Sequence, residues 1–193
     1  MIVETRERDL YEGVWSSMTD SYGDMSPGVR YLPIFLQVTG DTRGHVLDAG
    51  SGSGKAAVEL DQAGFRVTMA DFTDTGLVDE ARRFPFHAAC LWHSLKGIAP
   101  LGHFDWVFCC DVMEHLPTQF TMLAVEQMLK VSRSGLFLGI CLHAEQFGYY
   151  AGASLHKTVE SFTWWRDALK ELGHVTDARD LLSTGVYVVE PRR

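Results

Sequence analysis

The spacing of hydrophobic and polar positions changes several times between residue 44 and the end of the chain. Short apolar runs rich in β-branched and aromatic residues alternate with longer stretches in which apolar residues recur at helical spacing. The predicted strands cover 45–49, 65–70, 86–91, 104–110 and 135–142. The predicted helices cover 56–63, 74–83, 118–131 and 161–172. This alternation is typical of an α/β fold, and we expect one doubly wound, mostly parallel sheet with helices on both faces.

Three other parts of the chain complete the expected organisation. Two runs at 175–181 and 185–189 are separated by Ser183 and Thr184 and predict a closing hairpin. The segment 145–154, rich in glycine and tyrosine, and the aromatic N-terminal segment fall outside the alternation and are candidates for substrate and lid elements. We therefore divide the chain into an N-terminal lid or substrate segment, 1–43, and a single core domain, 44–193.

Composition and charge narrow the possible functions. A length of 193 residues with 46% hydrophobic residues describes one ordinary globular core. Seventeen Lys and Arg against 25 Asp and Glu give a net charge of −8, so we expect no binding to duplex nucleic acid. No apolar run approaches the roughly 20 residues that span a bilayer, and we expect a cytoplasmic protein without membrane contact. The four cysteines lie in apolar runs and are expected to be reduced core residues: Cys90, Cys109, Cys110 and Cys141.

The most distinctive local pattern is the glycine-rich turn after the first predicted strand. Residues 48–54 read Asp-Ala-Gly-Ser-Gly-Ser-Gly, directly before a predicted helix, so a ligand can approach the backbone closely there. The dinucleotide fingerprint would need a glycine at Lys55. The phosphate-loop pattern would need a glycine at Ala49 and Ser or Thr at Ala56. The turn therefore fits neither of these ligands.

Acidic residues follow the second and fourth predicted strands. Asp71 lies about 20 residues beyond the glycine turn, where Rossmann-type folds place an acid on ribose hydroxyls, although a strand-end acid can also cap a helix. Asp111 follows the aromatic run 104–110, and Glu114 and His115 come just after it. Because the carboxyl ends of parallel strands meet at one edge of a sheet, we expect Asp111 to face the ligand crevice. The alternative for Glu114 and His115 is that they only begin the next helix.

Taken together, these motifs resemble those of class I S-adenosylmethionine-dependent methyltransferases over residues 44–193. Residues 155–159, followed by Trp164, Trp165 and Gly173, are similar to small phage-type members. The resemblance implies methyl transfer from S-adenosylmethionine to an unidentified small molecule or exposed nucleophile. This cofactor has a sulfonium and an amino group but no phosphate, so it needs close backbone approach and a nearby carboxylate. The cofactor-binding positions that the resemblance implies are Asp48, Gly50, Ser51, Gly52, Asp71, Phe72, Asp111 and Val112.

The resemblance also suggests how adenine is bound, with one departure from the family pattern. Family members often carry an acid that takes the adenine amino group where this chain has His93. The contact would then fall to the backbone of Leu91, with Trp92 packing on the adenine ring. A core role for Trp92 is the alternative.

We expect the N-terminal segment to cover the methionine end of the cofactor. Tyr11, Trp15 and Tyr22 recur on a segment too short to form a core of its own, and Tyr22 is the expected contact. Arg30 is a candidate partner for the cofactor's carboxylate because of its charge. The alternative is a helix packed on the edge of the sheet.

The catalytic candidates are His156 and, in reserve, His115, which are expected at the carboxyl edge of the sheet. Methyl transfer mainly needs positioning and sometimes a general base. The sequence lacks the Asp-Pro-Pro-aromatic pattern of amino-methylating nucleic-acid enzymes after its fourth strand. Two other functions stay open: binding S-adenosylmethionine without transfer, and cleaving it. The spacing of the remaining candidate ligands predicts no metal site: His93, His103, His115, Asp105 and Asp111.

Overall fold

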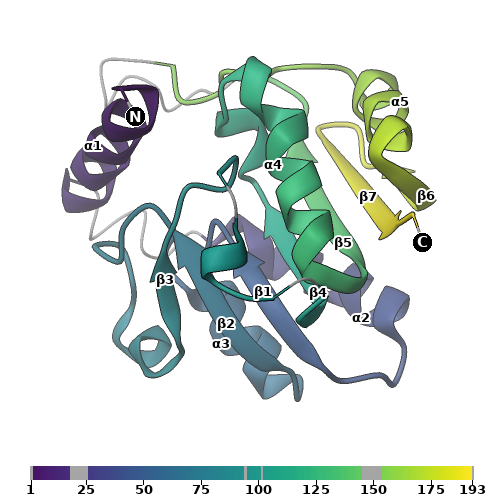
Figure 1. The fold of residues 1–193 in the computed structure, drawn as a ribbon, viewed down its shortest axis with the longest axis horizontal. Helices are drawn as coiled ribbons and strands as arrows, with labels where there is room; N and C mark the ends of the chain where they lie inside the picture. Colours follow the sequence, from purple (N-terminus) through teal and green to yellow (C-terminus); the bar gives the residue numbers. More distant parts are fainter. Residues whose placement is uncertain (1, 18–25, 94, 101, 145–153, 193) are drawn as a thin grey trace.

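The computed structural model describes residues 2–17, 26–93, 95–100, 102–144 and 154–192 (Figure 1). Its centre is a seven-stranded sheet with the order β3-β2-β1-β4-β5-β7-β6. The strands are β1 (His45–Ala49), β2 (Arg66–Asp71), β3 (Phe86–Ala88), β4 (Phe104–Cys110), β5 (Ser132–Cys141), β6 (Gly173–Asp180) and β7 (Thr184–Pro191). β1 to β5 pair in parallel, whereas β7 is antiparallel to both β5 and β6. The predicted mostly parallel sheet and its closing hairpin are thus confirmed.

Helices cover both faces of the sheet, as the alternating pattern predicts. The α-helices are α1 (Ile2–Ser17), α2 (Leu32–Thr39), α3 (Lys55–Gln62), α4 (Thr118–Val131) and α5 (Phe162–Leu172). One apolar layer lies between the sheet and α4 and α5, where Trp165 is fully buried. The other lies beneath α2 and α3, with Phe35 at its centre among four aromatic rings. The doubly wound architecture therefore rests on two separate cores.

Two predicted elements are shorter than expected. The predicted helix 74–83 is wrong, because only a 3-10 turn forms at Asp79–Arg83. Gly76 interrupts this segment, and the Val78 N–H donates to the Ser53 carbonyl (3.0 Å), which ties the chain to the glycine turn. The predicted strand 86–91 ends at Ala88, because the His93 N–H donates to the Cys90 carbonyl (3.0 Å) and closes a turn.

The sheet order places the cavity described below. Neighbouring strands run 3-2-1 on one side and 4-5 on the other, so the order reverses between β1 and β4. Ligands of open α/β sheets bind in the crevice outside the carboxyl ends of the strands at such a point. Within the described residues, no helix is both long and apolar enough to cross a membrane.

Candidate functional site

A cavity of about 760 Å³ opens at the carboxyl ends of β1, β2 and β4. Its volume lies within the roughly 300–1,000 Å³ typical of small-molecule sites. The cavity wall includes every described residue that the sequence analysis selected: Asp48, Gly50, Ser51, Gly52, Asp71, Phe72, Leu91, Trp92, Asp111, Val112, His115 and His156. Tyr22, the remaining selected residue, lies outside the described residues.

The glycine turn forms the floor of one end of the cavity. Gly50 (φ 77°) and Gly52 (φ 51°) both adopt the left-handed region that favours glycine. The Gly50 N–H donates to the Ala70 carbonyl (2.7 Å), which holds the turn against β2. A Cβ on Gly50 would lie 2.4 Å from Cγ2 of Val112, so the chain needs glycine here for both its conformation and its packing.

Asp71 stands at the end of β2 beside the glycine turn. Its Oδ2 accepts the Gly52 N–H (2.8 Å) and its Oδ1 accepts the Phe72 N–H (2.6 Å). Burial raises the pKa of Asp71, and these backbone hydrogen bonds oppose the rise by favouring the ionised form. The two hydrogen bonds fix the carboxylate at the edge of the cavity.

Asp48 and Ser51 leave polar atoms in this end of the cavity without protein partners. Asp48 Oδ2 and Ser51 Oγ are both buried, and neither has a hydrogen-bond partner in the structure. Burial raises the pKa of Asp48 to about 7, and the neighbouring Asp71 adds to the rise. Because buried polar groups are normally satisfied, such atoms in a cavity wall mark where a polar ligand would bind. Their carboxylate and hydroxyl chemistry fits a ligand with hydroxyl and cationic groups.

The opposite end of the cavity begins at Asp111, directly after β4. Asp111 adopts a left-handed backbone (φ 53°), which is strained for a residue other than glycine. Its Oδ1 accepts a hydrogen bond from Arg30 Nη2 at 3.1 Å. Burial raises the pKa of Asp111, and the Arg30 guanidinium opposes that rise. Arg30 lines the cavity but pairs with this carboxylate, a protein partner that the sequence analysis did not foresee.

Glu114 supports this end from behind the cavity wall. Its side chain is fully buried, and its Oε1 accepts the Cys141 N–H (3.1 Å). Its carbonyl accepts the N–H groups of Lys157 (2.7 Å) and Thr158 (2.9 Å). Burial raises the pKa of Glu114 well above its usual range, and Asp111 adds to the rise. Glu114 thus ties the loop after β4 to β5 and to the loop that carries His156.

The two histidines selected as catalytic candidates lie in contact but differ in chemistry. Their rings meet edge to face, 4.7 Å between centroids. His156 Nδ1 lies 2.8 Å from the His143 carbonyl, which can only accept, so Nδ1 carries the proton and Nε2 is the accepting nitrogen of the neutral ring. Burial lowers the pKa of His115 to about 3, and the neighbouring His156 adds to the fall. His156 is therefore the better placed proton acceptor.

The cavity end nearest β3 is apolar. Trp92 is buried and stacks on Phe120 (5.1 Å between centroids, 8° between planes), and its edge meets Phe72. Trp92 thus belongs to the core and also lines the cavity, so its core role is observed and its packing on adenine stays a prediction. The half-exposed His93 faces Glu4 and is not among the residues that line the cavity.

Helix α1 closes one side of the cavity with Tyr11, Val14 and Trp15. Trp15 packs so closely on the glycine turn that a Cβ on Gly52 would lie 2.9 Å from its ring. Tyr11 stacks on Phe72 (6.2 Å between centroids). The helix therefore lies over the glycine end of the cavity as well as beside its histidines.

Several cavity residues were missed by the sequence analysis. They lie at the end of β5 and the start of β7: Cys141, Ser183 and Thr184. His143, which the sequence offered as a third possible base at the carboxyl edge of the sheet, lines the cavity as well. The position of Cys141 at the carboxyl end of a predicted parallel strand was the available signal. Nothing in the sequence indicated that Ser183 and Thr184 belong to the site, because only the pairing of β7 with β5 brings them to the cavity.

The metal-ligand combination considered from the sequence is separated by the fold. Asp105 and His103 lie at the amino end of β4, whereas Asp111 and His115 lie beyond its carboxyl end. Among the described residues, the groups of three or more possible ligands within 4.8 Å of one another are different ones: Glu4 with Cys90 and His93, and Glu114 with Cys141 and His156.

Comparisons with known proteins agree with this geometry. A family model described as a methyltransferase domain matches residues 25–183. The magnesium protoporphyrin IX methyltransferase of Synechocystis PCC 6803, solved with bound S-adenosylmethionine, has a TM-score of 0.68 at 21% identity, covering 97% of this chain and 96% of that one. The 1,6-didemethyltoxoflavin-N1-methyltransferase of Burkholderia thailandensis, solved with its substrate and S-adenosylhomocysteine, has a TM-score of 0.73 at 16% identity, covering 96% and 87%. Among curated proteins, no significant sequence match was found.

Proposed function

Because the chain belongs to the methyltransferase domain family, we propose that it methylates a small molecule at an oxygen or nitrogen that carries a proton. The family makes the chain a methyltransferase, and S-adenosylmethionine is its methyl donor. The size of the cavity favours a small acceptor. The net charge of −8 argues against duplex nucleic acid as the acceptor.

At the glycine end, we propose that the Asp71 carboxylate accepts hydrogen bonds from the ribose hydroxyls. We also propose that Asp48 and Ser51 bind polar groups of the donor. The supporting observations are the fixed Asp71 carboxylate and the unpartnered buried atoms of Asp48 and Ser51. Gly50 and Gly52 allow the donor to approach the backbone. Leu91 and Trp92 would form the apolar wall for adenine, and Phe72 and Val112 would complete the contact surface.

At the histidine end, we propose that His156 is the general base. When bound, the donor supplies the methyl group. As the methyl group leaves the donor sulfur for the acceptor atom, His156 Nε2 would take the proton that the acceptor atom gives up. The hydrogen bond from Nδ1 to the His143 carbonyl holds the required tautomer. A positive charge on His156 favours the ionised form of Asp111, so the Asp111 carboxylate would in turn stabilise the imidazolium that forms.

We propose that the N-terminal segment, 1–43, acts as the cover of this site. Support comes from α1, whose Tyr11, Val14 and Trp15 line the cavity, and from Arg30, which pairs with Asp111. An ion pair between Glu7 and Lys157 joins α1 to the loop that carries His156. The cover would thereby contact both ends of the site.

The observation that carries the proposal is one cavity that holds an unpartnered carboxylate oxygen of Asp48 at one end and, at the other, the His156 ring with its Nδ1 proton directed at the His143 carbonyl. The test incubates the protein with methyl-labelled S-adenosylmethionine, with and without a small-molecule extract, and follows the products by mass spectrometry. We expect S-adenosylhomocysteine and one labelled small molecule only when extract is present. Methylthioadenosine formed without extract would instead indicate cleavage. Binding with no product in any extract fraction would indicate a protein that binds without transfer.

A further inference from the structure

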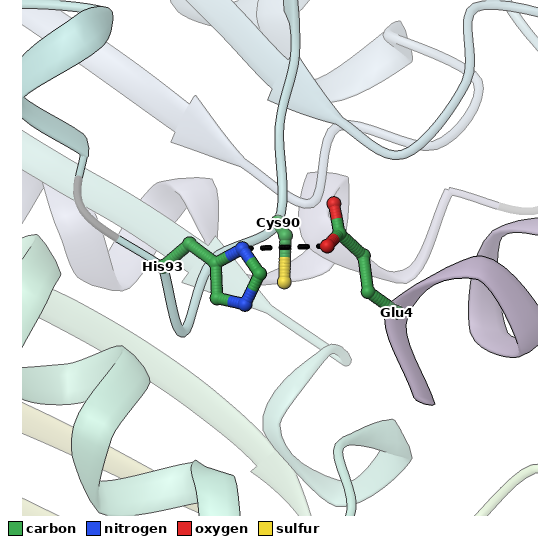
Figure 2. A group of neighbouring side chains, drawn as sticks. All are labelled: Glu4, Cys90 and His93. Carbon is green, nitrogen blue, oxygen red and sulfur yellow. Dashed lines mark ion pairs between the residues drawn. The ribbon is translucent and has the colours of Figure 1, made fainter. Parts of the chain in front are cut away.

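A second group of reactive side chains lies outside the cavity, between α1 and the turn after β3. In this turn the His93 N–H donates to the Cys90 carbonyl (3.0 Å), which brings residues 90 and 93 close together. Figure 2 shows the His93 ring and the Glu4 carboxylate facing each other, and the Cys90 side chain lies next to both. The sequence analysis did not pair these residues, because Glu4 and Cys90 are far apart along the chain.

The distances within this group suit a metal ion. One ligand atom from each of the three side chains lies within 4.8 Å of the other two. His93 Nδ1 is 3.4 Å from Glu4 Oε2, longer than the usual 2.7–2.9 Å of a charge-assisted hydrogen bond. A tetrahedral zinc ion with bonds of about 2.0–2.2 Å to nitrogen and oxygen would hold these two atoms about 3.4 Å apart. The carboxylate and the imidazole are thus already at ligand spacing.

The chemistry of the three groups matches one class of metal. Zinc binds thiolate, imidazole and carboxylate ligands together, whereas calcium and magnesium prefer oxygen ligands alone. Glu4 Oε1 lies 3.6 Å from Arg8 Nη2, which leaves Oε2 directed at His93.

The group is open to solvent on one side and closed on the other. The His93 side chain is 50% exposed and that of Glu4 is 23% exposed, so an ion can enter from solvent. The Cys90 side chain is buried, and burial raises its pKa to about 11, so the thiol keeps its proton until a metal replaces it. A fourth position would remain for water on the solvent side.

We propose that Glu4, Cys90 and His93 bind one zinc ion. Binding forms bonds from the metal to Cys90 Sγ, His93 Nδ1 and Glu4 Oε2, and the thiol proton leaves to solvent. The ion would fasten the first turn of α1 to the turn that carries Leu91 and Trp92. Both elements line the cavity, so zinc would set how firmly the cover is held. This inference rests on the three side chains and not on the proposed methyl transfer.

The test adds cobalt, as a coloured substitute for zinc, to metal-free full-length protein under reducing conditions. We expect one equivalent to produce sulfur-to-cobalt charge-transfer absorption, which zinc then displaces. Cys90→Ser should remove the band. His93→Ala and Glu4→Gln change residues that reach the surface and should fold normally, and each should weaken binding by about tenfold to a hundredfold. Zinc at about 100 times its dissociation constant should raise the melting temperature by roughly 5–11 °C.

Matched variants separate this site from the other candidate group. Glu12→Gln alters an exposed acid on the same helix and should bind cobalt like the unaltered protein. Cys141→Ser alters the cysteine of the group in the cavity and should keep the band. Loss of the band in Cys141→Ser but not in Cys90→Ser would overturn the proposal. Unchanged affinity in both His93→Ala and Glu4→Gln would overturn it as well. Neither the cobalt absorption band nor the affinity for cobalt depends on an acceptor or on methyl transfer.

Discussion

The two ends of the cavity are built in different ways. The floor of the glycine end comes from one continuous stretch, β1 to the end of β2, and hydrogen bonds from backbone N–H groups hold its parts in place. The histidine end joins segments from Arg30 to Thr184, and side chains such as Glu114 hold them together. A local motif therefore prepares the floor of the proposed donor site, whereas the proposed acceptor site forms only after the whole chain has folded.

The electrostatic character of the two ends also differs. Asp48 and Asp71 lie close together at the glycine end, and the charge of Asp71 adds to the rise in the pKa of Asp48. At the histidine end, Arg30 offsets Asp111, and burial keeps the His115 ring neutral at physiological pH. We infer that one end selects a cationic ligand and that the other receives a proton.

The largest expected effect concerns the histidine end. With an identified acceptor, His156→Ala should lower kcat by about 10²- to 10⁴-fold, the usual contribution of a general base. The affinity for S-adenosylmethionine, measured by calorimetry, should stay unchanged because His156 lies away from the glycine turn. A loss of kcat without a loss of donor affinity would show that the two ends act separately.

His115→Gln is the matched control for this prediction. The pKa of His115 is lowered to about 3, so its ring is a poor proton acceptor at neutral pH, and the replacement should cost kcat far less than His156→Ala. Turnover of His156→Ala within about twofold of the unaltered protein, less than 1 kcal/mol of barrier, would leave His156 with a structural role only.

The next largest effect concerns the backbone of the glycine end. Gly50→Ala places a methyl group 2.4 Å from Cγ2 of Val112 at a residue with φ 77°. The left-handed conformation alone costs an L-residue roughly 1–2 kcal/mol, and the stiff valine can move little. We expect the affinity for S-adenosylmethionine to fall by about a hundredfold, as calorimetry would measure.

A second glycine shows whether this loss is specific. In Gly13→Ala on α1, the added methyl group meets nothing within 4 Å, so donor affinity should be retained. Chemical unfolding of both variants would show whether each remains folded. Equal affinities for the two variants would refute the role assigned to the glycine turn.

The difference between the glycine end and the histidine end of the cavity also explains what could be predicted from the sequence. β1, β4 and α4 match their predicted ranges because apolar period and local propensity determine them. The glycine turn, Asp71 and Asp111 were found because each follows a strand, and parallel strands end at one edge. The helix predicted over 74–83 failed because contacts with the glycine turn overrode its local propensity.

The histidine end was predicted only in part, for a physical reason. His156 was selected from its place after the fifth strand, but its tautomer depends on the His143 carbonyl. The pairing of Arg30 with Asp111 joins residues 81 positions apart. The burial that lowers the pKa of His115 comes from the packed fold. Neither the spacing of residues along the chain nor the composition of the sequence indicates such long-range contacts.

A smaller effect is expected from the Asp71 carboxylate. Asp71→Ala should weaken the binding of S-adenosylmethionine by about 1–3 kcal/mol, the usual cost of losing a charged hydrogen-bond partner. The same variant frees the N–H groups of Gly52 and Phe72, so part of this loss should come from a looser turn. Asp74→Ala, an exposed acid three residues further on, is the control and should bind normally. Unchanged affinity in Asp71→Ala would remove Asp71 from the donor site.

The smallest effect follows from the ionisation of Asp48. Burial and Asp71 raise the pKa of Asp48 to about 7, so this carboxyl is mostly protonated at pH 6 and mostly ionised at pH 8. Only the ionised form of Asp48 attracts a cationic donor. The affinity for S-adenosylmethionine is therefore highest above pH 7 and is lost as the pH falls through that value. Between pH 8 and pH 6 we expect about a tenfold loss, since each pH unit below the pKa costs up to 1.36 kcal/mol.

Asp48→Asn separates this ionisation from the titration of the donor's own amino group, which also changes charge in this range. The amide keeps the size of the side chain but has no proton to release. Its binding should therefore be weaker at pH 8 and should show only the dependence that the donor itself contributes. The difference between the two pH profiles, measured by calorimetry from pH 6 to pH 8, isolates Asp48. Parallel profiles would mean that Asp48 keeps one charge state throughout, and the cationic selectivity of the glycine end would then rest on Asp71 alone.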